Sequence, residues 1–153
     1  MPSALFANQR ETNLASAITM VEDVLIERGL FLGGAVIEQP GALRAWRFTS
    51  GSASITVALL DRPRFSHLRV EAGVLTIDDR VDLPALFADL LARNRDLAGA
   101  AFALDGRRVL LVSERTTLDL DRSEVQHLIA TLAAAADAAD DELVARHGGT
   151  RGA

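Results

Sequence analysis

The predicted strand Arg107–Arg115 carries apolar side chains on both of its faces. Side chains alternate along a strand, so Val109 and Leu111 point to one side of the sheet while Leu110 and Val112 point to the other. An antiparallel sheet with one solvent-exposed face shows a regular alternation of apolar and polar residues along each strand instead. This strand therefore needs cover on two sides, and the pattern leaves open which of its faces belongs to the core.

Two helices are predicted in the first two thirds of the chain. Apolar residues recur every three or four positions through Leu14–Leu25, which is one face of a helix that Thr12 or Asn13 can cap. Acidic residues before Pro84 predict the start of a second helix, which runs to about Arg93.

A third helix is predicted near the end of the chain. Asp121 and Glu124 have the spacing of a capping box, and an apolar stripe from Val125 to Leu132 follows them. The helix then continues through an alanine-rich stretch and ends at His147, before two glycines. A long alanine face allows another backbone to approach this helix closely.

Between the helices, the period of the pattern changes to two, which predicts strands. Asp105-Gly106 is the strongest hairpin signal, because a type I′ turn needs a positive φ at both central residues. We expect an α+β domain of two layers: a curved antiparallel sheet of about five strands and three helices, in the order α-β-β-β-α-β-β-α. The predicted domain covers residues 10–146, after a flexible N-terminus (1–9) and before a disordered tail (147–153).

Composition and motifs predict neither catalysis nor a bound cofactor or metal. The chain has 153 residues, no cysteine and a net charge of -5, which disfavours a nucleic-acid partner. His67, His127 and His147 lie far apart in the sequence, and no glycine-rich phosphate loop is present. The acidic cluster before Pro84 is ordinary for a helix start. We therefore expect a protein that is not an enzyme.

No segment has the length and apolarity of a membrane span or an export signal. The sequence therefore predicts a cytoplasmic protein without a membrane partner.

The doubled apolar face predicts contact with another protein. Trp46 and Phe48 share one face of their strand and can extend the surface formed by Leu110 and Val112. These four residues are the candidate protein-binding or dimer face. A second copy of the chain or a segment of a client protein would cover it.

The second half of the chain resembles the type III secretion chaperone-like superfamily over residues 82–144. The resemblance lies in a pattern of apolar and turn positions, carried by Leu90–Asn94, Gly99–Gly106, Val109–Val112, Leu118–Asp121 and the helix residues Asp137 and Asp140–Leu143. It is similar to the Tir-chaperone group and to the YbjN-type group, described as sensory-transduction regulators. Asp140 and Asp141 stand where the secretion branch commonly has an aromatic residue, which favours the YbjN-type branch.

The resemblance implies a non-catalytic module that dimerises and binds other proteins, in the secretion chaperones by holding an extended client segment. A homodimeric chaperone or adaptor is accordingly the first functional hypothesis. The alternative is a regulatory domain that binds a small molecule or nucleotide in a pocket between the first helix and the sheet.

Overall fold

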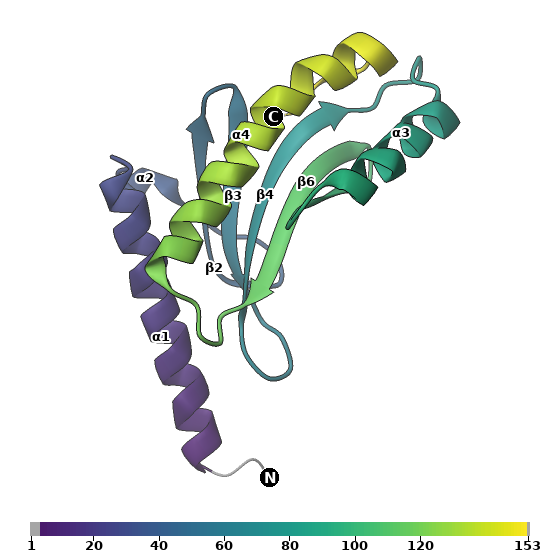
Figure 1. Cartoon of the computed structure of the whole chain (residues 1–153). Coiled ribbons are helices and arrows are strands. Elements are labelled where there is room, and N and C mark those ends of the chain that lie inside the picture. Colours follow the sequence, from purple (N-terminus) through teal and green to yellow (C-terminus); the bar gives the residue numbers. More distant parts are fainter. Residues whose placement is uncertain (1–3, 153) are drawn as a thin grey trace. The chain divides into compact units, whose positions relative to one another are not determined.

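The computed structural model describes residues 4–152. Along the chain (Figure 1), the elements are α1 (Ala4–Glu27), α2 (Leu32–Ala35), β1 (Val36–Ile37), β2 (Ala42–Ser50), β3 (Ala53–Leu60), β4 (His67–Thr76), α3 (Leu83–Asp96), β5 (Ala101–Asp105), β6 (Arg108–Thr116), α4 (Arg122–His147) and β7 (Thr150–Arg151). The strands form one sheet in the order β1-β2-β3-β4-β6-β5, and β7 pairs with β4. The predicted α+β class is confirmed.

The described elements exceed the predicted numbers of about five strands and three helices. The additions are the four-residue helix α2 and the two-residue strands β1 and β7. The sequence left Ala35–Ile37 open as a short edge strand, and β1 lies within that segment. Elements this short have no periodicity for a sequence pattern to show. One of them lies in the segment predicted as a disordered tail: Thr150 and Arg151 pair antiparallel with Thr76 and Leu75 of β4.

The chain divides into two compact units, which are described separately. The first holds the chain up to Phe48, Thr56–Arg69 and Glu114–Ile129, and the second holds Thr49–Ile55, Val70–Ser113 and the chain from Ala130.

In the first unit, α1 buries its apolar stripe and is joined to β2 by polar contacts. Val21 and Leu25 are fully buried, as is Trp46 of β2. The Trp46 indole N–H donates to a Glu22 carboxylate oxygen at 3.3 Å, and Arg44 donates to the same oxygen at 2.9 Å. The Arg44 guanidinium also lies 5.8 Å from the centre of the Trp46 ring. Trp46 is thus a core residue whose one polar atom has a partner.

The predicted N-cap of α1 at Thr12 or Asn13 is wrong, because the helix already begins at Ala4. Asn13 uses its side-chain amide for a tertiary contact instead of a cap. Its Oδ1 accepts from the Thr117 hydroxyl at 2.7 Å, and its Nδ2 donates to the Thr117 carbonyl oxygen at 3.4 Å. Residues 1–3 of the predicted flexible N-terminus lie outside the described residues.

The hairpin signal is confirmed in part. The predicted hairpin is present, but its turn lies one residue further along: Asp105 pairs with Arg108, so the central residues are Gly106 and Arg107. Of these two, Gly106 alone has a positive φ, of 58°, so the predicted type I′ turn, which needs a positive φ at both, is wrong.

The capping box at the start of α4 is confirmed. The Glu124 backbone N–H donates to Asp121, and the Asp121 N–H donates back to the Glu124 carboxylate, which makes the predicted capping box.

Candidate functional site

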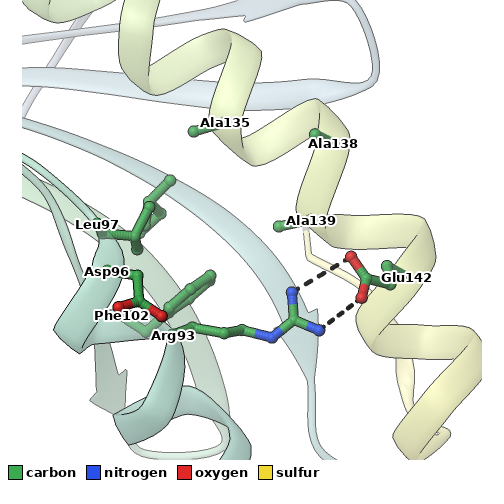
Figure 2. A pocket seen from close by; sticks show the side chains of 9 residues that line it. Arg93, Asp96, Leu97, Phe102, Ala135, Ala138, Ala139 and Glu142 are labelled. Carbon is green, nitrogen blue, oxygen red and sulfur yellow. Dashed lines mark hydrogen bonds and ion pairs between the residues drawn. The ribbon is translucent and has the colours of Figure 1, made fainter.

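In the second unit, an apolar cavity of about 350 Å³ lies between α3, β5 and α4 (Figure 2). Its apolar lining is Leu97, Phe102, Leu111, Ala135, Ala138 and Ala139, and its polar lining is Arg93, Asp96 and Glu142. The three alanines have the spacing of one helix face, and their small side chains leave the space that a longer residue would fill. An apolar hollow with a few charged groups at its margin is the usual composition of a binding site.

The helix α3 is capped at its start and joined to β5 near its end. At its start, the Ala85 N–H donates to the Asp82 carboxylate at 3.1 Å, and Pro84 occupies the first turn. Near its end, the Asn94 side chain reaches the backbone of β5. Its Oδ1 accepts from the Phe102 N–H at 2.6 Å, and its Nδ2 donates to the Phe102 carbonyl oxygen at 3.2 Å.

The contact of Asn94 has a consequence for the edge of the sheet. β5 is the last strand in the order, so within residues 4–152 one side of its backbone has no neighbouring strand. Asn94 satisfies the N–H and the carbonyl of Phe102 as a neighbouring strand would. Strand addition at this point of β5 is therefore blocked, and the cavity beside Phe102 is the accessible feature.

Arg93 joins α3 to α4 at the margin of the cavity. Figure 2 shows its guanidinium reaching Glu142, and the two hydrogen bonds measure 2.7 and 3.3 Å. Its Nε also donates to Asp89 at 3.0 Å. The hydrogen bond to Glu142 and the neighbouring carboxylates raise the pKa of Arg93, and the Arg93 contact lowers the pKa of Glu142. Both groups stay charged at neutral pH, so this margin is polar while the walls are apolar.

Asp89 holds the far end of α4 against α3. Burial alone would raise the pKa of this carboxyl, but hydrogen bonds from His147 and Arg93 and the charges of Arg93 and Arg146 lower it to about 2. The His147 Nε2 lies 2.7 Å from a carboxylate oxygen, and the Asp89 side chain is only 16% exposed. This ionised group therefore joins the end of α4 to α3.

Replacing Asp89 by asparagine is expected to lower the free energy of unfolding by about 2 kcal/mol at neutral pH. The pKa of Asp89 is depressed on folding, so its contribution is present above about pH 4 and is lost as pH falls through the folded value. Urea denaturation should show that the difference in free energy of unfolding between the wild type and Asp89→Asn becomes smaller between about pH 4 and pH 2. Asp96→Asn, at an exposed residue, is the control, and an equal difference at every pH would contradict the assignment.

The predicted binding-face residues lie in different surroundings. Trp46 is fully buried and Phe48 is 8% exposed, so neither offers a free surface in the single chain. Leu110 is also buried, whereas Val112 is partly exposed. Their opposite-face neighbours Val109 and Leu111 are fully buried, so both faces of this strand are largely covered within one chain.

The face that bears Leu110 and Val112 is apolar only at one end of β6. In the β5–β6 register, Ala103 lies opposite Leu110 and Ala101 lies opposite Val112, and both alanines are exposed. Two residues beyond Val112, the same face carries Glu114.

Glu114 is the centre of a charged group in the first unit. Its oxygens contact Arg62 at 3.1 and 3.3 Å, His67 at 3.0 Å and Arg69 at 2.9 Å. Burial opposes ionisation, but the hydrogen bond from Arg62 and the charge of Arg69 lower the pKa of Glu114. The apolar second face that the sequence predicts at the centre of this strand therefore does not extend to this end, where the same face carries a charged group.

Sequence reasoning missed the cavity. In the sequence, Arg93 and Glu142 look like solvent-exposed charged residues. Nothing in the pattern marks Leu97, in a loop, or Phe102, in a strand, as lining a cavity. The one available signal was the alanine spacing of the last helix, which predicted a close approach but not what approaches.

Within the described residues, no helix is long and apolar enough to cross a membrane.

Comparison with known families finds one match over most of the chain. The model of TY-Chap1, described as T3SS (YopN, CesT) and YbjN peptide-binding chaperone 1, matches residues 15–153. That range includes every residue that lines the cavity. No curated protein sequence matches the chain.

Three similar solved structures have the same fold at low sequence identity. The ExsC–ExsE complex aligns with a TM-score of 0.65 at 18% identity and covers 84% of this chain and 94% of that chain. The HopA1–SchA chaperone–effector complex aligns with a TM-score of 0.61 at 14% identity and covers 86% of this chain and 97% of that chain. The third structure is the Yersinia pestis type III secretion chaperone SycH in complex with a stable fragment of YscM2. It aligns with a TM-score of 0.54 at 17% identity and covers 79% of this chain and 97% of that chain.

Proposed function

We propose that this chain, which belongs to the TY-Chap1 family of peptide-binding chaperones, holds an extended segment of a client protein in the cavity between α3, β5 and α4. The observation that carries the proposal is the apolar cavity with its charged margin. Similar structures were solved as complexes of a chaperone with an effector or with a protein fragment. A non-catalytic holding role fits the absence of any catalytic motif in the sequence.

The shape and chemistry of the cavity favour a peptide side chain over a polar ligand. Leu97, Phe102 and Leu111 offer apolar contact, while Arg93 and Glu142 can hydrogen-bond a peptide backbone at the margin. Burying one large apolar side chain contributes roughly 1.5–3 kcal/mol. Micromolar binding corresponds to about 8.2 kcal/mol, so neighbouring residues of the segment must add contacts if the affinity is to reach that range.

The test is selection of peptides from a displayed random library on the full chain, followed by calorimetry with the best sequence. We expect one class of extended peptide with an apolar anchor residue. Selection of no peptide above background would contradict the proposal. A metabolite that raises the melting temperature, with no peptide effect, would support the small-molecule alternative instead. Against that alternative, α1 packs on β2 through fully buried Val21, Leu25 and Trp46.

We further propose that the chain pairs with a second copy through the apolar end of the β5–β6 face. Ala101 and Ala103 are small and exposed, and Ala101 lies opposite the partly exposed Val112, which gives an apolar surface at this end of the face. A stable dimer buries roughly 1,200–2,000 Å² in total, so residues around this patch must join the interface.

Replacing Val112 by aspartate is expected to convert a dimer into a monomer. The carboxylate would lose its water in the interface without a partner, which is costly. Sedimentation equilibrium of the wild type at micromolar concentration should give twice the chain mass, and the variant should give the chain mass. Leu104→Asp, on the opposite face of the same hairpin, is the control. A monomeric, folded wild type would refute the pairing.

A further inference from the structure

β4 lies between β3 and β6 in the sheet, and its last two residues also pair with a later segment of the same chain. Beyond α4, the chain turns at Gly148 and Gly149, whose φ values are 80° and 78°, and Thr150–Arg151 then pairs with β4 as β7. The pairing is antiparallel, with Arg151 opposite Leu75 and Thr150 opposite Thr76. This is the antiparallel backbone pairing by which an extended peptide adds to a sheet.

The two glycines that flank β7 lie closer to β4 than any other residue type could. A Cβ on Gly149 would come within 2.5 Å of the Thr76 carbonyl oxygen. A Cβ on Gly152 would come as near to the backbone of Gly73 and Val74. Both contacts are shorter than real Cβ atoms show, and the obstacle is backbone that cannot swing aside. This end of β4 therefore selects for glycine at two positions three residues apart.

Little else holds the segment in place. Thr150 and Arg151 are exposed, and the described side-chain contact is the ion pair of Arg151 with Asp141, whose side chains are 52% and 69% exposed. Exposed ion pairs contribute little. A two-residue strand behind two glycines belongs to the part of a structure that opens at low free-energy cost.

We propose that the end of β4 at Gly73–Thr76 is a second peptide site and that residues 149–152 are its displaceable occupant. The peptide class that fits is an extended segment with glycine at two positions three apart and a basic residue that reaches Asp141. This site is separate from the apolar cavity and does not depend on it. Its chemistry is backbone pairing and close approach, whereas the cavity accepts an apolar side chain.

The test releases the occupant and supplies it as a separate peptide. In the full chain, Gly149→Val with Gly152→Val should expel the segment by clash. The probe is a fluorescein-labelled peptide with the sequence of residues 146–152. We expect it to bind the double variant at least tenfold more tightly than the wild type. A peptide with valine at both glycine positions is the control and should not bind.

Hydrogen exchange reports the site of binding. In the double variant, the β4 amides that face β7 should exchange at least tenfold faster than in the wild type, and the peptide should restore their protection. Unchanged exchange in the variant, or faster exchange without peptide binding, would overturn the proposal. Arg151→Glu, which replaces the ion pair with repulsion from Asp141 and adds no backbone clash, is the second variant if the first does not fold, and it should change both readouts in the same direction by a smaller factor. Both readouts are independent of the cavity.

Discussion

Truncation of Trp46 to alanine is expected to destabilise the protein by about 3–5 kcal/mol. The side chain is fully buried, and its removal leaves a cavity under α1. It also takes away the indole N–H that Glu22 accepts and the ring over which Arg44 lies. Since small domains are stable by roughly 5–15 kcal/mol, this single change removes a large share of the total.

The measurement is urea denaturation followed by circular dichroism, because Trp46 is the one tryptophan of the chain and cannot report its own removal. Phe31→Ala is the matched control: Phe31 is 83% exposed, and its truncation should change the free energy of unfolding by less than about 0.5 kcal/mol. A small effect of Trp46→Ala on stability, together with a loss of self-association, would instead restore Trp46 to a binding face.

Filling the cavity is expected to abolish peptide binding without harming the fold. Ala138 is an exposed residue of the cavity wall, so Ala138→Phe can place its ring in the apolar space beside Phe102 and Leu111. A peptide selected on the wild type should then bind at least tenfold more weakly, which corresponds to about 1.4 kcal/mol. Calorimetric titration measures the change in affinity.

Ala134→Phe is the matched control for that prediction. Ala134 is an exposed alanine of the same helix, outside the cavity lining. Equal loss of affinity in the two variants would show that the added ring acts through helix properties and not through the cavity. Equal stability of both variants in urea denaturation separates the loss of binding from unfolding.

Local signals in the sequence predicted local structure well. The Asp105-Gly106 hairpin and the capping box at Asp121 depend on backbone conformations that few residues favour, so their patterns are specific, although the turn lies one residue further along than predicted. The helix stripe that contains Val21 and Leu25 also identified buried residues, because apolar residues that recur at the helical period share one face of the helix.

The features that the sequence missed depend on which segments meet. The Asn94 side chain has no pattern that predicts a contact with the Phe102 backbone eight residues later. The start of α1 at Ala4 was missed because Asn13, a good cap, is used in a contact with Thr117, far away in the chain. The margin of the cavity forms where Arg93 contacts Glu142 of another helix, and the strand Thr150–Arg151 forms by pairing with β4. Neither contact can be predicted from a local pattern.

The most direct test of the account locates the bound peptide by intermolecular nuclear Overhauser effects to isotopically labelled alanine methyl groups. The alanines of the chain sit at informative places, with Ala135, Ala138 and Ala139 on the cavity wall and Ala101 and Ala103 on the exposed face of β5. We predict contacts from the anchor residue of the selected peptide to the three wall methyl groups and none to the two on β5. Contacts to Ala101 and Ala103, without contacts to the wall, would contradict the assignment of the cavity as the client site.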